Sequence, residues 1–173
     1  VVSTPNDLHF EQVAHWLDRG KNVFCEKPLC LDYKSAKSLY EKAFDNNVTL
    51  YVDDIFIWRN EFYNVSDFRW SKQSNLNYIE RLAYHHFYLW VRNKKISVDK
   101  ITKTSEYSFT IELIGGMSAN FDYSPSDSVI HRIDGKDVLP RPDNQLKKML
   151  LIVFSGNTYK HFNRNVTLNA TYL

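Results

Sequence analysis

The fold is decided by a short stretch of sequence, GKNVFCEKP at residues 20–28. An apolar run over residues 22–25 leads directly into Glu26, Lys27 and Pro28, and the proline ends the strand that the run predicts. In a parallel sheet the carboxyl ends of the strands line the ligand crevice, so we expect Lys27 to emerge at the edge of a cleft. The plainer alternative is a surface ion pair formed by Glu26.

Strand and helix signals alternate on both sides of this stretch, over residues 1–57. The strand-like segments are residues 1–3, 22–25 and 48–52, and the helical ones are residues 8–17 and 33–44. Asn6 or Asp7 is expected to cap the first helix and Asp32 the second. Because parallel strands need crossover helices, this order predicts an α/β unit of βαβαβ type with three adjacent parallel strands.

The pattern changes after about residue 57, which we take as a domain boundary. Further strands are expected at residues 65–70, 98–104, 108–114, 117–123, 129–133 and 165–172, and helices at residues 79–91 and 143–154. Glycine-containing pairs at residues 115–116 and 134–135 are typical of hairpin turns. Residues 58–173 are therefore expected to form an α+β domain, a mostly antiparallel open sheet with helices on one face.

Composition excludes several classes of protein. The 22 basic and 20 acidic residues are interspersed, which argues against a nucleic-acid partner. No apolar run approaches the roughly 20 residues that span a bilayer, and residues 1–6 do not resemble a signal peptide, so we expect a cytoplasmic protein with no membrane partner. Five glycines, at positions that build neither a G-x-G-x-x-G loop nor a phosphate-binding P-loop, exclude both motifs.

Two further polar groups are candidates for chemistry. Thr4, Pro5 and Asn6 end the first strand and His9 follows them, an arrangement that can hold a cofactor ribose or phosphate or can simply cap a helix. His85 and His86 are adjacent on a predicted helix and point about 100° apart, so only one is expected to face a cleft. No metal site is expected, because helical histidine ligands usually stand at positions i and i+4 and no Cys/His cluster is present.

Taken together, TPNxxH at residues 4–9 and GKNVFCEKPL at residues 20–29 strongly resemble the Gfo/Idh/MocA family of NAD(P)-dependent sugar oxidoreductases. The resemblance is strongest over residues 1–58. It implies that residues 1–57 are the C-terminal portion of a dinucleotide-binding Rossmann domain and that residues 58–173 are a substrate and oligomerisation domain. Hydride transfer between NAD or NADP and a sugar or nucleotide-sugar hydroxyl is the implied reaction, and a homo-oligomer through the open sheet is the implied assembly.

The resemblance also assigns roles to single residues. Lys27 matches the lysine that contacts the nicotinamide and the reacting hydroxyl, and His85 the general acid/base of the substrate-domain helix. The remaining positions that match cofactor contacts are Thr4, Pro5, Asn6, His9, Glu26 and Pro28.

Two departures limit what the resemblance implies. Arg81 and Ala83 stand where the family's D-x-G-x-H motif has its aspartate and glycine, so the sugar site is either specialised or degenerate. The family's first strands and its Gly-rich loop do not precede residue 1. We therefore expect an incomplete form of the enzyme that binds NAD(P) weakly, if at all.

Two other functions remain open. One is a non-catalytic short relative that acts as a binding or assembly protein through its open sheet. The other, less favoured because of the Lys27 motif, is a carbohydrate-binding module whose aromatic side chains stack on sugars.

Overall fold

The computed structural model describes residues 1–55, 65–71, 78–92, 94–138, 144–155 and 163–173. Two compact units divide the chain. The first unit contains Val1–Trp58 together with Asp143–Leu173, and the second contains Arg59–Pro142.

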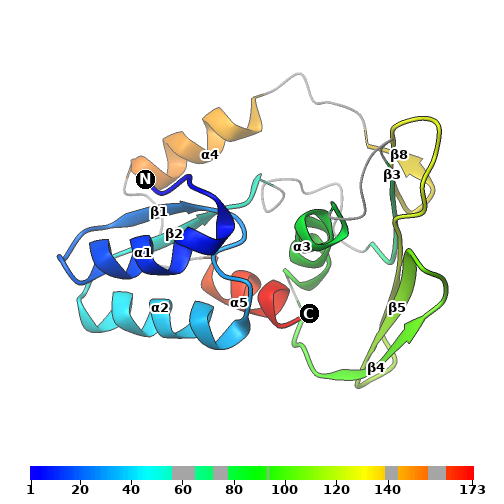
Figure 1. Cartoon of the computed structure of the whole chain (residues 1–173), viewed down its shortest axis with the longest axis horizontal. Helices are drawn as coiled ribbons and strands as arrows, with labels where there is room; N and C mark the ends of the chain where they lie inside the picture. The colour runs from blue at the N-terminus through cyan, green and yellow to red at the C-terminus, as the bar shows by residue number, and fades with distance from the viewer. Residues whose placement is uncertain (56–64, 72–77, 93, 139–143, 156–162) are drawn as a thin grey trace. The chain divides into compact units, whose positions relative to one another are not determined.

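The first unit is built on a small parallel sheet (Figure 1). Its elements are the 3-10 helix η1 (Asn6–Leu8), α1 (His9–Leu17), β1 (Val23–Glu26), α2 (Tyr33–Asp45), β2 (Leu50–Asp53), α4 (Gln145–Phe154) and α5 (Arg164–Tyr172). Strand β1 pairs in parallel with β2, and Val2 forms a parallel bridge to Cys25 on the other side of β1. The three extended segments therefore lie side by side in parallel, which confirms the partial Rossmann unit.

Local sequence signals set several of the helix ends in this unit. Gly20, with φ +65°, follows α1 in the left-handed region that favours glycine. Asp32 caps α2, as expected, by accepting a hydrogen bond of 2.9 Å from the backbone N–H of Ser35. The expected cap of the first helix is wrong. Pro5 holds the cap position of η1, where no side chain bonds the helix end, because the short 3-10 turn starts at Asn6 itself.

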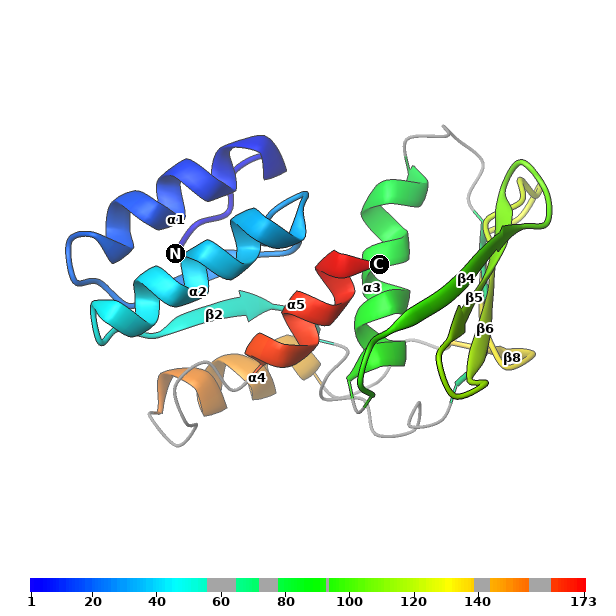
Figure 2. The same cartoon turned by 90° about the horizontal axis from the view of Figure 1, so that it is seen from below.

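The parallel sheet has helices on both faces (Figures 1 and 2). Helices α1 and α2 pack on one face, and their main apolar cluster contains Val13, Leu17, Leu39, Val23, Leu50 and Leu168. A smaller cluster on the other face joins Phe24 and Tyr51 of the sheet to Met149 of α4. Both clusters are made of side chains that alternate along the strands, so the residues of β1 and β2 are apolar on both faces, as in other parallel sheets.

The two cysteines belong to this core. Cys25 and Cys30 are free thiols, exposed by 0% and 4%. Burial is the main cause that raises the pKa of both, for Cys30 from 9.0 to about 12. We expect iodoacetamide to label neither thiol in the native chain at neutral pH, and both in urea, as read by mass spectrometry, because the thiolate is the reactive form.

The same shift predicts a loss of stability in alkali. An unfolded thiol ionises above pH 9.0 while the buried Cys30 does not until about pH 12. Stability from this group is complete below the unfolded pKa and falls as the pH rises between these values. Rapid labelling of both cysteines in the folded chain would contradict the buried positions.

The second unit is a sheet with one helix against it (Figure 2). Its elements are β3 (Asp67–Ser71), α3 (Tyr78–Val91), β4 (Val98–Lys103), β5 (Ser108–Leu113), β6 (Ser118–Asp122), β7 (Ile130–Ile133) and β8 (Lys136–Asp137). The strand order is β4-β5-β6-β3-β7-β8. All its pairs are antiparallel except β3 with β6, so the expected mostly antiparallel open sheet is confirmed.

Aromatic side chains hold α3 to this sheet. Phe121 of β6 is 1% exposed and stacks on Phe68 of β3 and Phe109 of β5, with centroid distances of 4.9 and 5.2 Å. From α3, Phe87 and Trp90 meet the same ring edge-on at 5.0 and 5.8 Å. The high aromatic content of the sequence thus serves this core.

The strand expected at residues 165–172 is wrong. These residues form α5, which packs against α2 in the first unit, with Tyr172 edge-on to Tyr33 at 5.6 Å. Alternating Val166, Leu168 and Ala170 suggested a strand, but Thr167 between them is also buried, as a helix face requires. Within the described part of the chain, no helix has the length and apolar content needed to cross a membrane.

Candidate functional site

The candidate site of the first unit is the edge where its parallel strands end. Val2 N–H donates to Phe24 O at 2.8 Å, and Glu26 N–H donates to Val2 O at 2.9 Å. Glu26 lies opposite Asp53 in the register between β1 and β2. The residues that follow each strand, among them Thr4, Lys27 and Asp54, are therefore brought to one edge of the sheet, where ligands bind in open α/β folds.

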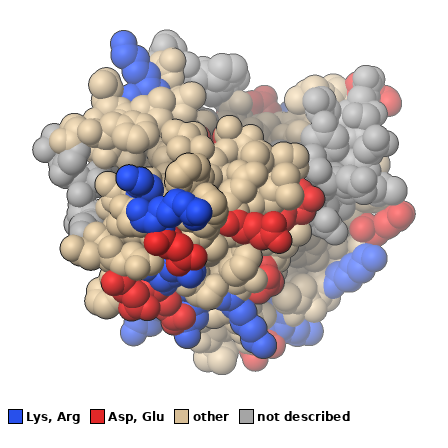
Figure 3. Space-filling view, turned by 60° about the vertical axis from the view of Figure 1, so that its left-hand side comes forward, with Lys and Arg blue, Asp and Glu red and all other residues tan. Residues whose placement is uncertain are grey.

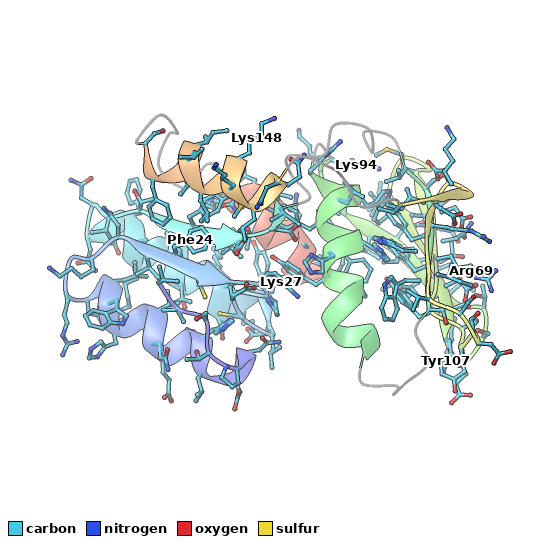
Figure 4. The ribbon with its side chains drawn as sticks, turned by 90° about the horizontal axis from the view of Figure 1, so that it is seen from above. Phe24, Lys27, Arg69, Lys94, Tyr107 and Lys148 are labelled. Carbon is cyan, nitrogen blue, oxygen red and sulfur yellow. The ribbon has the colours of Figure 1, made fainter. Side chains whose placement is uncertain are left out.

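Lys27 follows directly after β1 (Figure 4). Its side chain is half-buried, and its backbone N–H donates to Glu26 Oε2 at 3.1 Å. The peptide bond between Lys27 and Pro28 is cis. The carboxylate of Glu26 thus accepts a hydrogen bond from the backbone of the next residue, and Lys27 itself lies at the strand-end edge.

His9 connects two of these strand ends. Its imidazole is 0% exposed, with Nδ1 2.8 Å from Pro28 O and Nε2 2.8 Å from Thr4 O. A carbonyl oxygen only accepts, so each nitrogen carries a hydrogen when both bonds form. In this structure His9 contacts backbone on both sides, and it fixes the segments that flank Lys27.

The TPN segment lies beside this histidine. Thr4 Oγ1 donates to Gln12 Oε1 of α1 at 3.2 Å, Pro5 is exposed, and Asn6 is half-buried. The fold therefore brings Thr4, His9 and Pro28 into one hydrogen-bonded group.

Sequence reasoning missed one carboxylate at this edge. Asp54 follows β2, is 0% exposed, and its backbone N–H donates to Val52 O at 3.0 Å. Val52 O also accepts a hydrogen bond of 2.8 Å from Nδ2 of Asn163, a buried residue at the N-cap position of α5 whose side chain makes no capping bond to that helix. The YVDD run could have indicated Asp54, since it places acids at a strand end, but nothing local points to Asn163.

The two adjacent histidines lie on α3 of the second unit, and they differ in burial. His85 is half-buried, whereas His86 is 2% exposed and faces the sheet. His86 Nδ1 lies 3.0 Å from Tyr123 Oη, and its Nε2 lies 3.2 Å from His131 Nε2. Burial, followed by the neighbouring His131 and His85, lowers the pKa of His86 to about 3. His86 is therefore neutral at physiological pH, and His85 is the one that can serve a site outside this core.

Charges are mixed over the surface shown in Figure 3. Basic and acidic side chains alternate there, and ion pairs of the first unit join Lys42 to Asp18 and, at 3.6 Å, Lys37 to Glu41. Among the residues that the structure describes, there is no group of three or more His, Cys, Asp or Glu side chains that could hold a metal ion.

The comparison with known families matches residues 1–54 to a model described as "Oxidoreductase family, NAD-binding Rossmann fold", the GFO_IDH_MocA family. Over these residues the chain matches the Gfo/Idh/MocA oxidoreductase family. The match covers Val2, β1 and β2, which are the strands that form the edge described above, so the sequence resemblance and the observed fold agree.

Two individual proteins that match part of this chain are also oxidoreductase-like or sugar-acting by name. An uncharacterised oxidoreductase of Streptococcus pneumoniae is 37% identical over 67 residues, 39% of this chain and 18% of that protein. The 2,7-anhydro-N-acetylneuraminate hydratase of Mediterraneibacter gnavus is 32% identical over 87 residues, 50% of this chain and 22% of the hydratase. These matches span less than a quarter of either relative.

The fold of the whole chain also has a solved counterpart. UDP-N-acetylglucosamine 3-dehydrogenase GnnA from Acidithiobacillus ferrooxidans superposes with a TM-score of 0.72 and 13% sequence identity, over 97% of this chain and 73% of GnnA. At that identity the likeness concerns the fold alone. It extends the agreement beyond residue 54, where the sequence match to the family ends.

Proposed function

We propose that this chain provides the nicotinamide side of an NAD(P)-dependent oxidoreductase that acts on a sugar or nucleotide-linked sugar. The observation that carries the proposal is the position of Lys27 directly after a parallel strand, in a segment that matches an NAD-binding family. The activity named for the hydratase, which concerns sialic-acid chemistry, supports the choice of a sugar as the substrate class.

The strand-end edge fits one half of a dinucleotide better than the other. Its cationic, hydrogen-bonding side chain, Lys27, suits a nicotinamide and a reacting hydroxyl, with Glu26 and Pro28 beside it and Thr4, Pro5 and Asn6 nearby for a ribose or phosphate. None of the chain's five glycines builds the G-x-G-x-x-G turn that cradles a pyrophosphate. This chain is therefore expected to bind NAD or NADP weakly, if at all, although its residues suit the nicotinamide part.

The chemistry assigned to the residues follows from their types. NAD(P), when bound, supplies the acceptor for a hydride. The ammonium of Lys27 donates a hydrogen bond to the substrate oxygen and stabilises charge that develops on it. The family resemblance gives His85, on the second unit, the role of taking the hydroxyl proton, which imidazole side chains commonly do in enzymes. The substitutions at Arg81 and Ala83 leave open which sugar this histidine serves.

Reduced nicotinamide mononucleotide tests the proposal, because it contains only the half of the cofactor that this edge suits. Titrated into the 15N-labelled full chain, it is expected to shift the amide signals of Thr4, Asn6, Lys27 and their non-proline neighbours at residues 25, 26 and 29. Lys27→Ala should weaken this binding at least tenfold, since the charged hydrogen-bond donor is lost.

Lys21→Ala is the matched control, because Lys21 is exposed and precedes the same strand at its opposite end. It should leave the titration unchanged. Equal affinities of the wild type and Lys27→Ala, or shifts centred on Lys21, would overturn the proposal.

A binding or assembly protein remains the alternative function. Its surface would be the sheet face opposite α3, where Thr110 bonds Asn120 at 2.8 Å and Arg69 lies 3.5 Å from Asp122. These polar groups of the described strands bond one another, whereas obligate interfaces are more apolar, and we favour the enzyme. A homo-oligomer through this sheet stays a prediction that light scattering on the purified chain can test.

A further inference from the structure

The cluster that neither the family motif nor the proposed reaction uses is the contact between His86 of α3 and His131 of β7. Their Nε2 atoms lie 3.2 Å apart, and the ring centroids lie 5.3 Å apart at 36°. The two residues are 45 positions apart in the chain, so the fold alone brings them together. His86 also stacks on Phe68 at 5.1 Å, which fixes its ring against β3.

The position of the proton between the two Nε2 atoms decides whether these nitrogens can bind a ligand. Each neutral imidazole carries one N–H, and only one proton can lie between the two facing Nε2 atoms. When that proton moves to Nδ1 of the same ring, both Nε2 lone pairs become available and no proton is gained or lost. The two unprotonated nitrogens then lie 3.2 Å apart.

The spacing suits a metal ion. Zinc–nitrogen bonds are about 2.0–2.1 Å long, so two histidine nitrogens on one tetrahedral zinc lie roughly 3.3 Å apart. The observed separation of 3.2 Å is close to this value. The half-buried position of His131, beside the short edge strand β8, supplies contact with solvent.

Tyr123 supplies the support that metal-binding histidines commonly have. Its buried hydroxyl lies 3.0 Å from Nδ1 of His86, where it can accept the hydrogen of that nitrogen. When Tyr123 accepts that hydrogen, His86 is in the tautomer whose Nε2 lone pair faces His131, and outer partners fix metal-binding histidines in the same way.

We propose that His86 and His131 bind a divalent transition-metal ion such as Zn²⁺ through their Nε2 atoms. Water or an oxygen of a small ligand completes the coordination. This site lies within the second unit and does not depend on the NAD(P) proposal. The sequence pointed away from it because it paired His86 only with its neighbour His85, while His131 belongs to a distant strand.

Titration of the chelator-treated full chain with Zn²⁺ alone, followed by calorimetry, tests the site. One zinc per chain is expected. His131→Gln should weaken binding at least tenfold because it removes a ligand, and Tyr123→Phe by about tenfold because it removes the partner of Nδ1. His15→Gln, which removes an exposed histidine of α1, is the control and should bind as the wild type does.

A spectroscopic measurement keeps the test independent of how well the variants fold. Electron paramagnetic resonance of the wild-type chain with one equivalent of Cu²⁺ should show two imidazole nitrogens bound to copper. A signal with fewer nitrogens, or zinc binding that survives His131→Gln but not His15→Gln, would overturn the proposal. Because nicotinamide mononucleotide plays no part in either measurement, failure here leaves the proposed function untouched.

Discussion

Replacing His9 by alanine is expected to destabilise the first unit by about 3 kcal/mol, since the change leaves one buried and one partly buried carbonyl oxygen without their donor. The imidazole is 0% exposed and holds Thr4 O and Pro28 O at 2.8 Å each. Alanine offers no donor to either oxygen and leaves a void at the centre of the strand-end edge. The free energy of unfolding, measured in urea by far-UV circular dichroism, gives the size of the loss.

His15→Ala is the matched control for this change. It lies on the same helix but is exposed, and its contact is with Arg19 at 2.9 Å. Substitutions at such positions usually change stability by less than about 0.5 kcal/mol. If His9→Ala proved as stable as His15→Ala, the two hydrogen bonds of His9 would contribute nothing and its positioning role would be excluded.

The same substitution separates a structural from a functional effect. His9 flanks Lys27 through Pro28 but does not itself present a free nitrogen to the strand-end edge. A variant that still folds in the cold should therefore bind reduced nicotinamide mononucleotide less well than His15→Ala does. Loss of stability without loss of affinity would show that the histidine holds the fold but does not shape the edge.

Features that depend on neighbouring residues could be predicted from the sequence, and features that depend on contacts between distant residues could not. Gly20 and Asp32 set helix ends through their own backbone and side chain, so the first unit's helices and parallel strands could be predicted. The α5 segment could not, because β-branched residues favour strands and only packing on α2 decides for a helix.

The site shows the same limit. Lys27 could be placed at a strand end because the strand and the proline that ends it are adjacent in sequence. The bonds from His9 to Pro28 and from His86 to His131 join residues 19 and 45 positions apart. Hydrophobic periodicity carries no information on such pairs, so the sequence indicated His9 and His86 as candidates but not their partners.

Replacing Phe121 by alanine is expected to cost the second unit about 3–5 kcal/mol, the range for removing a large aromatic ring from a core. The ring is 1% exposed and lies nearly parallel to Phe68, at 3°, while Phe87 and Trp90 of α3 meet it edge-on. Truncation therefore removes contacts with the sheet and with the helix together. Urea unfolding and amide exchange along β5 and β6 measure the loss.

Ile101→Ala is the control, because Ile101 lies on β4 of the same sheet but is 57% exposed. It should change stability by well under 1 kcal/mol. A Phe121→Ala variant no less stable than this control would mean that the aromatic stack does not hold α3 to the sheet.

The same substitution is also expected to weaken Zn²⁺ binding by His86 and His131. His86 stacks on Phe68, and Phe68 stacks on Phe121, so loosening this stack should also weaken Zn²⁺ binding, although Phe121 touches neither ligand nitrogen.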